Sequence, residues 1–231
     1  MERNWRELIK PSRLDIDEDS HGPQYAKFSC EPLERGFGHT IGNALRRILI
    51  SSLQGAAITN VRIEGVLHEF STIPGVLEDV SDIILNLKGV RLRFLGMEPT
   101  TLTISVRGEG AVKAGSIQTP PGVDILNPEH HIATLGPDGR LEAEMTVKTG
   151  KGYVTADRNK NPDDPIGVIA LDAAFSPITK VNYVVTQARV GQITDYDKLT
   201  LEVYTNGAVR PEDAVAFAAK ILKEQLILFI N

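Results

Sequence analysis

Residues 31–52 read EPLERGFGHTIGNALRRILISS and carry the strongest structural signal in the chain. Gly36 and Gly38 stand at the start of a run in which apolar residues recur every three or four positions. That spacing predicts an amphipathic helix with one face toward a core. Gly55 is expected just beyond its end, at the C′ position. The apolar stripe consists of Phe37, Ile41, Ala44, Leu45, Ile48, Leu49 and Leu53.

Most of the remaining sequence is typical of short β-strands with one solvent-exposed face. Apolar and polar residues alternate at 26–30, 92–94, 102–106, 141–147 and 199–203. Such alternation favours antiparallel sheets over the continuously apolar strands of a parallel α/β core. Glycine- and proline-rich loops at 108–139 and 150–167 separate these segments and indicate a second, sheet-dominated module in the middle of the chain.

A second helix is predicted from Glu78 to Lys88. The acidic residues Glu78 and Asp79 lie in its first turn, and Lys88 followed by Gly89 closes it, which is the charge order that the helix dipole favours. Its apolar stripe consists of Val80, Ile83, Ile84 and Leu87.

The third predicted helix begins with Pro211 at position N1 and continues to the last residues of the sequence. Its apolar arc is wider than one core-facing stripe requires. The second face must be covered either by another layer of the same domain or by a second subunit, and the pattern leaves both open. The first stripe consists of Ala214, Phe217, Ala218, Ile221 and Leu228. The second stripe, beside the first, consists of Val215, Leu222, Leu226 and Phe229.

The composition is that of a globular protein, with 231 residues, 42% hydrophobic and 24% charged. Cys30 is the one cysteine, so no internal disulfide is possible, and no apolar run approaches the ~20 residues of a membrane span. We expect an intracellular, soluble protein without a signal peptide. The net charge of −5 disfavours a broad nucleic-acid-binding face.

The search for catalytic motifs favours a binding or assembly protein over an enzyme. Gly36, Gly38 and Gly42 have spacing one residue too long for a dinucleotide fingerprint, so close packing is the preferred interpretation. One cysteine and five scattered histidines supply no zinc motif. Asp172 lies in an apolar segment and is interpreted as a capping residue, an interface residue or a general base. The alternative function is a nucleotide- or small-molecule-binding enzyme that uses the Gly36–Gly42 turn.

Five motifs in register, at 31–52, 65–72, 84–89, 165–177 and 194–199, resemble the N-terminal domain of the bacterial DNA-directed RNA polymerase α-subunit family. The resemblance implies an α+β fold of antiparallel sheets with two long dimerisation helices and an inserted mostly-β module. The implied dimerisation module is discontinuous, 1–54 with 176–231, and the inserted module spans 55–175.

The resemblance also implies the function. Family members form a homodimer, a non-catalytic scaffold on which the β and β′ subunits of this cytoplasmic, nucleoid-associated nucleotidyltransferase assemble for transcription. Magnesium and nucleotide chemistry belong to those larger subunits, so no cofactor is expected in this chain. Full subunits continue past the third helix into a small domain that binds promoter DNA and activators. The present sequence stops at Asn231, and no direct DNA contact is expected from these residues.

Specific residues match positions to which the family gives interface roles. Because Arg47 is two residues from Leu45 and from Leu49, it is predicted to project away from the core. Ile193 stands where members often carry arginine, so no charge-based contact is expected there. The implied β-subunit contacts are Arg47, Arg46, Glu34, Arg35, His68, Glu69 and Phe70. The implied β′-subunit contacts are Lys88, Leu171 and Lys198. The implied dimer contacts are Phe37, Ile41, Leu45, Phe217, Ile221, Leu222 and Phe229.

Overall fold

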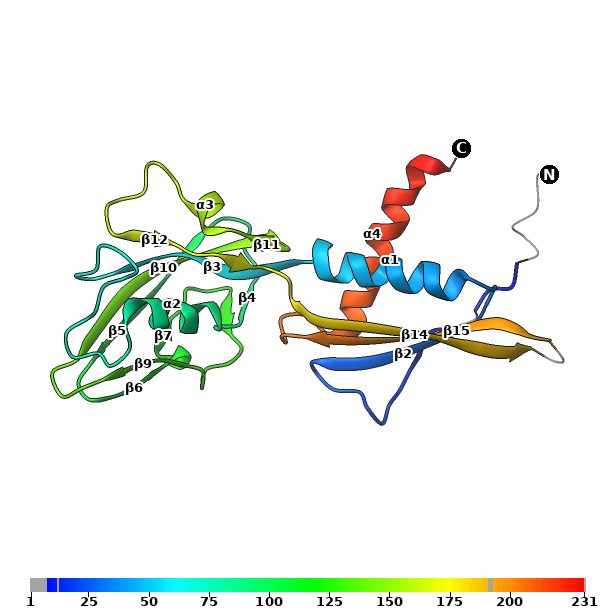
Figure 1. Ribbon diagram of the computed structural model, residues 1–231, viewed down its shortest axis with the longest axis horizontal. Helices are drawn as coiled ribbons and strands as arrows, with labels where there is room; N and C mark the ends of the chain where they lie inside the picture. The colour runs from blue at the N-terminus through cyan, green and yellow to red at the C-terminus, as the bar shows by residue number, and fades with distance from the viewer. Residues whose placement is uncertain (1–7, 12, 191–192, 231) are drawn as a thin grey trace. The chain divides into compact units, whose positions relative to one another are not determined.

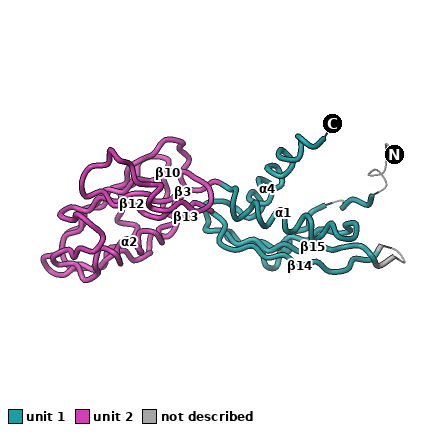
Figure 2. Tube along the Cα trace, turned by 45° about the horizontal axis from the view of Figure 1, so that its top comes forward, with its two compact units in different colours: residues 1–53, 177–231 teal, residues 54–176 magenta. Residues whose placement is uncertain are grey.

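A computed structural model describes residues 8–11, 13–190 and 193–230. The chain divides into two compact units, residues 1–53 with 177–231 and residues 54–176 (Figure 2). Each unit combines antiparallel sheet with helices, so the predicted α+β class is confirmed. No helix of the described residues is long and apolar enough to span a membrane.

The first unit is built on a four-stranded antiparallel sheet of order β1-β2-β15-β14. The alternating segments at 26–30 and 199–203 lie in its two central strands, where Phe28 is opposite Leu201 and Ala26 is opposite Val203. These inward residues are almost fully buried, which confirms the predicted alternation. The strands are β1 (Asp15–Ile16), β2 (Tyr25–Leu33), β14 (Ile178–Val190) and β15 (Ile193–Thr205).

Two long helices belong to this unit. Helix α1 (Phe37–Ser52) lies along one face of the sheet, and α4 (Pro211–Leu226) crosses α1 (Figure 1). A 3-10 turn, η2 (Ile227–Phe229), follows α4. The first half of α4 buries Ala214, Val215 and Ala218 in the same core as Leu49 of α1. The first predicted helix and the start of the third at Pro211 are therefore confirmed, but α4 ends at Leu226 instead of continuing as an α-helix to the end of the sequence.

The predicted role of Gly55 as the C′ residue of the first helix is wrong. The residue after α1, Leu53, is already extended, and β3 (Gln54–Ile63) begins directly after it. Gly55 lies opposite Gly150 in a strand pair and is thus part of a sheet. The helix ends here because Leu53 is buried with the core of its unit while the chain continues into β3.

Gly38 and Gly42 allow α1 to approach the sheet closely. A Cβ atom on Gly42 would lie 2.7 Å from Cδ2 of Tyr183 and 2.8 Å from Cδ1 of Leu199. A Cβ atom on Gly38 would lie 2.8 Å from Cγ1 of Val185. Any larger side chain would have to displace the strand side chains that pack beneath the helix. The interpretation of this glycine spacing as close packing is confirmed.

Gly42→Val is expected to destabilise the first unit by about 1–3 kcal/mol, the usual cost of overpacking a filled core. The exposed neighbour Asn43 provides the control, and Asn43→Ala should change the free energy of unfolding by about 0.5 kcal/mol or less. Both values come from urea unfolding curves of the two variants and the parent. Equal stability of Gly42→Val and the parent would show that the helix can move off the sheet at no cost.

The second unit is built on a seven-stranded antiparallel sheet of order β7-β5-β10-β3-β4-β8, with β12 also paired to β3. Besides β3, its strands are β4 (Leu92–Phe94), β5 (Thr100–Arg107), β7 (Ile117–Gln118), β8 (Val123–Ile125), β10 (Arg140–Lys151) and β12 (Val168–Ala170). Two small sheets accompany it, β6 (Gly110–Lys113) with β9 (His131–Leu135), and β11 (Tyr153–Val154) with β13 (Ala173–Ala174). The helical elements are α2 (Val80–Lys88), α3 (Ala156–Asn159) and the 3-10 turn η1 (Ala114–Ser116).

Helix α2 starts two residues later than predicted. Asp79 is its N-cap, and its carboxylate accepts a hydrogen bond from the backbone N–H of Asp82 at 2.8 Å. Glu78 lies outside the helix and bonds β9 instead, accepting from the backbone N–H of Thr134 at 2.6 Å and interacting with the ring of His131 at 2.8 Å. The predicted apolar stripe of this helix is buried in the core of the unit.

The contacts of Glu78 make the stability of the second unit pH-dependent. Burial by itself raises the pKa of the Glu78 carboxyl, but the hydrogen bonds from Thr134 and His131 outweigh burial and hold the pKa below its ordinary value. A lowered pKa in the folded state stabilises the fold above the unfolded pKa of about 4.3, and this stabilisation is lost as the pH falls through the folded pKa.

The expected result is that Glu78→Gln reduces the loss of stability between neutral and acid pH. The free energy of unfolding, measured by urea titration from pH 7 to pH 3, should fall less steeply for the variant than for the parent. Glu109→Gln, at an exposed position, is the matched control and should follow the parent. Identical slopes for Glu78→Gln and the parent would contradict the role of this carboxylate.

Candidate subunit interfaces

The candidate β-subunit contacts in the first unit lie on α1 and the turn before it. Arg47 is exposed, as predicted from its place opposite the apolar stripe, and its guanidinium has no partner among the described residues. Arg46 is half-buried and donates to Oδ1 of Asn43 at 3.0 Å. Glu34 accepts from the backbone N–H of Ile9 at 2.9 Å, and Arg35 is exposed. Arg35 and Arg47 are the members of this set whose guanidinium groups have no partner among the described residues, so both can form new bonds with another chain.

The other three β-subunit candidates lie in the second unit, in the loop between β3 and α2. His68, Glu69 and Phe70 are all exposed, and the Phe70 side chain retains 82% of its accessible surface. Within the loop, the His68 ring is 3.2 Å from the Ser71 hydroxyl. Leu67 of the same loop is 70% exposed, and exposed apolar side chains such as these are of the kind that protein contacts cover.

The β′-subunit candidates differ in their accessibility. Lys88 pairs with Asp172 at 3.1 Å and Lys198 pairs with Glu31 at 2.7 Å, both on partly exposed surfaces. Leu171, by contrast, is 2% exposed within the core of the second unit. A side chain without accessible area cannot form a contact surface, so the assignment of Leu171 as a direct contact is corrected. The side chain of Ile193 lies outside the described residues.

Asp172 acts as a structural residue. Its Oδ1 accepts the backbone N–H of Ala156 at the start of α3 at 2.8 Å, while Oδ2 binds the Lys88 ammonium. The hydrogen bond from Ala156, and then the one from Lys88, hold the pKa of the Asp172 carboxyl below its ordinary value. A carboxylate whose pKa is lowered is poorly suited to general acid–base work near pH 7, so the general-base interpretation of Asp172 is disfavoured and its contact with Ala156 fits the capping interpretation.

A carboxylate of the protein itself binds the glycine turn before α1, which the sequence pattern did not reveal. Oδ2 of Asp197 accepts the backbone N–H groups of Gly36 at 2.8 Å and Gly38 at 3.0 Å. Gly36 adopts φ +88°, a left-handed conformation that favours glycine. The donors that would hold a phosphate are therefore occupied by a carboxylate 161 positions away from Gly36. This arrangement leaves the nucleotide-binding alternative without a binding site at that turn.

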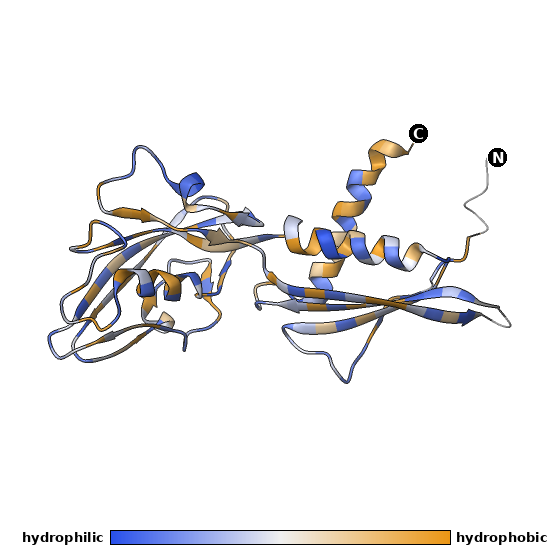
Figure 3. Ribbon diagram, viewed as in Figure 1, coloured by the Kyte–Doolittle hydropathy of each residue, from blue (hydrophilic) through white to orange (hydrophobic). Residues whose placement is uncertain are grey.

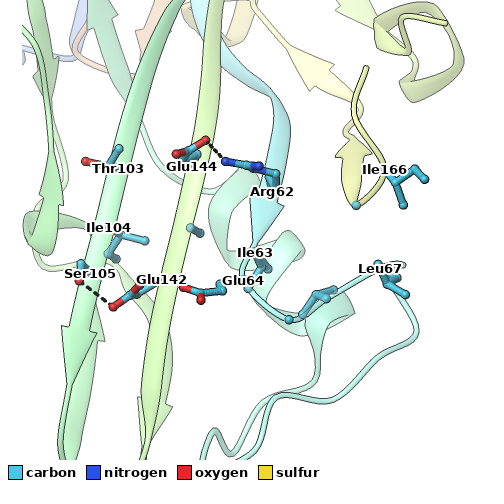
Figure 4. Close-up of a pocket in the computed structure, with 14 residues that line it drawn as sticks. Arg62, Ile63, Glu64, Leu67, Thr103, Ile104, Ser105, Glu142, Glu144 and Ile166 are labelled. Carbon is cyan, nitrogen blue, oxygen red and sulfur yellow. Dashed lines mark hydrogen bonds and ion pairs between the residues drawn. The ribbon is translucent and has the colours of Figure 1, made fainter. Parts of the chain in front are cut away.

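A cavity of about 760 Å³ lies against β3, β5 and β10 of the second unit (Figure 4). Its ionisable side chains are paired with one another or with nearby arginines: Arg62 with Glu144 at 2.7 Å, Glu64 with Arg140 at 2.9 Å, and Glu142 with Arg107 at 2.9 Å. Hydrogen bonds from Arg140 and Arg107 hold the pKa of Glu142 well below its usual range. The carboxylates of this surface are thus engaged in a row of ion pairs across the strands.

The candidate dimer contacts all belong to the first unit. Phe37, Phe217 and Phe229 are exposed, with 43%, 53% and 82% of their surface accessible. Ile41, Ile221 and Leu222 are half-buried. Leu45 is 9% exposed and packs in the core of its own unit, so its assignment as a dimer contact is corrected.

The residues at the end of α4 and in the turn after it are mostly hydrophobic (Figure 3). Their hydrophobic side chains are exposed. Leu228 is 88% exposed and Ile230 is 72% exposed. The wide apolar arc predicted for the third helix is therefore only partly covered by its own unit: Ala214, Val215 and Ala218 are buried, whereas Phe217 and the residues from Leu226 onward are exposed. We call the exposed set Phe217, Leu226, Ile227, Leu228, Phe229 and Ile230 the α4 apolar surface.

These features define the class of the protein before any comparison. Among the described residues no group of three or more His, Cys, Asp or Glu side chains is arranged to hold a metal ion. The exposed residues include an arginine on α1, the phenylalanine of the loop before α2 and the α4 apolar surface. The chain is of the class of α+β assembly subunits, which act through surfaces offered to other chains.

Comparison with known proteins identifies the family. Residues 61–176 match the family described as RNA polymerase Rpb3/RpoA insert domain. Over all 231 residues the chain is 64% identical to the DNA-directed RNA polymerase subunit alpha of Geobacter metallireducens, of which it covers 68%. It is 59% identical to the proteins of that name from Pelobacter propionicus and Syntrophus aciditrophicus, covering 68% and 67% of them. The chain belongs to the bacterial RNA polymerase α-subunit family, which is the family that its five motifs resemble. It is a non-catalytic subunit of that nucleotidyltransferase.

Proposed function

We propose that this chain forms a homodimer that serves as the platform on which the β and β′ subunits of the polymerase assemble. The observation that carries the proposal is the α4 apolar surface, whose members are each about half or more exposed. Exposed apolar surface of this kind is characteristic of a protein–protein interface. The candidate contacts Phe37, Phe217 and Phe229 have accessible side chains in the same unit.

The energies support self-association. Burying one large apolar side chain contributes about 1.5–3 kcal/mol. Two-fold symmetry uses each such contact twice, so several residues per subunit outweigh an association cost of about 4–15 kcal/mol.

In this proposal Arg47 and its neighbours contact the β subunit, and Lys88 of the second unit and Lys198 of the first each contact β′. Magnesium and nucleotide chemistry reside in those larger subunits, in the cytoplasm and on the nucleoid, and direct contact with promoter DNA is made by other parts of the polymerase. The net charge of −5 supports the last point, since DNA-binding surfaces are usually basic.

Light scattering tests the dimer directly. At micromolar concentration the chain should have twice the mass of the 25.2 kDa monomer. Addition of purified β and then β′ should give complexes of successively larger mass. A stable monomer at micromolar concentration, or a dimer that captures neither subunit, would overturn the proposal.

A further inference from the structure

Strand β12 lies at an open edge of the large sheet of the second unit. It pairs antiparallel with β3, with Val168 opposite Arg62, Ile169 opposite Val61 and Ala170 opposite Asn60. Among the described residues no strand pairs with its other side. An open strand edge presents backbone groups that can pair with another chain.

The register shows which groups point outward. The backbone N–H of Leu171 donates to the carbonyl of Thr59 at 2.8 Å, so these two residues face each other in a hydrogen-bonded pair. Bonded and non-bonded pairs alternate in an antiparallel ladder. Ile169 therefore also faces β3, whereas the N–H and C=O of Ala170 point away from it. On the far side of β3, the N–H of Glu64 donates to Glu142 of β10 at 2.9 Å, and the same alternation directs Asn60 toward β10.

A cavity of about 630 Å³ runs along this edge. Ile84 and Lys88 of α2 line one side, and the 156–167 segment lines the other. The Lys88–Asp172 ion pair at 3.1 Å joins α2 to the end of β12. Because Ala170 has the smallest side chain that carries a Cβ, another backbone can approach it closely.

The lining of this groove has the charge that suits a basic partner. It contains four carboxylates, those of Glu69, Asp157, Asp164 and Asp172, against the ammonium groups of Lys88 and Lys160. Asp172 is paired with Lys88, and Asp164 accepts from the backbone N–H of Asn161. The carboxylates of Glu69 and Asp157 have no partner among the described residues. Leu67 and Ile166, 70% and 91% exposed, add apolar surface to the rim.

We propose that the β12 edge receives a short extended segment of the β′ subunit, which adds to the sheet as a further strand through the N–H and C=O of Ala170. The segment carries basic side chains toward Glu69 and Asp157 and an apolar side chain toward Leu67 and Ile166. The inference rests on the proposed function, because the groove includes Lys88, one of the candidate β′ contacts. Glu69 of the same lining is a candidate β contact, so the β′ segment occupies the groove in one copy of the dimer and the β subunit contacts Glu69 in the other. Main-chain bonds supply affinity in strand addition, and the side-chain pockets supply specificity.

Residue-resolved hydrogen exchange tests the pairing. In the isolated dimer the amides of Ile169 and Leu171 should exchange slowly and the amide of Ala170 quickly. In the complex assembled from this chain with β and β′, the amide of Ala170 should become protected in one of its two copies. An Ala170 amide that is already protected in the isolated chain would show that a second copy or the chain itself covers the edge. An assembled complex in which it stays unprotected in both copies would overturn strand addition while leaving the proposed function intact.

A matched pair of variants gives a second measurement. Ala170→Pro removes the outward N–H, which β3 does not use, whereas Ala170→Val keeps it. The two variants are compared at equal melting temperature and dimer mass. Ala170→Pro should weaken capture of β′ by about 10-fold or more, because a carbonyl of the added strand loses its donor. Ala170→Val should leave capture of β′ unchanged. Capture of β by both variants is the control. Equal capture of β′ by the two variants would overturn the pairing, and failure of both β and β′ to bind even the parent would instead contradict the proposed function.

Discussion

Replacing Arg47 with alanine is expected to weaken binding of the β subunit at least 30-fold while leaving a normally folded dimer. Arg47 is exposed on α1 and has no partner among the described residues, so its loss should change the free energy of unfolding by about 0.5 kcal/mol or less. A guanidinium can form bidentate, charge-assisted bonds with a carboxylate or with carbonyls across an interface. When an acceptor is buried on docking and the substitution has removed its donor, the binding free energy is weakened by about 2–5 kcal/mol.

The measurement combines melting temperature, dimer mass and capture of the β subunit on one preparation. Arg91→Ala is the matched control, since Arg91 is also an exposed arginine but is not a candidate contact. A large drop in melting temperature for Arg47→Ala would identify Arg47 as a structural residue. Capture of β at the level of the parent would show that Arg47 is an ordinary solvated charge.

The double variant Phe217→Glu with Phe229→Glu is expected to convert the dimer to a folded monomer. Both side chains are exposed in the single chain, 53% and 82%, so the variant retains its own core. In a dimer, each lost phenylalanine removes about 1.5–3 kcal/mol, and symmetry doubles the loss. Each introduced carboxylate would in addition have to be buried without a partner.

Light scattering of this variant at micromolar concentration should give 25.2 kDa, with an unchanged circular dichroism spectrum. Phe70→Glu is the control, because it makes the same chemical change at an exposed phenylalanine of the other unit and should remain dimeric. A double variant that stays dimeric would place the interface elsewhere on the chain.

The candidate contacts show how far sequence reasoning reached. Arg47 could be placed on the outer face of its helix because a helical period of 3.6 residues fixes its direction relative to Leu45 and Leu49. Leu45 and Leu171 were named as contacts by resemblance to the family, and both are buried. Periodicity separates an apolar face from a polar one, but it does not say whether an apolar face meets the protein's own core or another chain.

The sequence by itself determined the local elements: α1 and α4, the alternating strands, and the glycines that let α1 pack against its sheet. These follow from spacing within a few residues, where backbone geometry alone decides which side chains share a face. Only the tertiary structure decided that Asp197 occupies the donors of Gly36 and Gly38, that the end of α4 is uncovered, and that Ala170 turns its backbone outward. Each of these depends on which distant segments lie together, because a hydrogen bond or a buried surface is defined by both partners, and chain folding brings the second partner to the first.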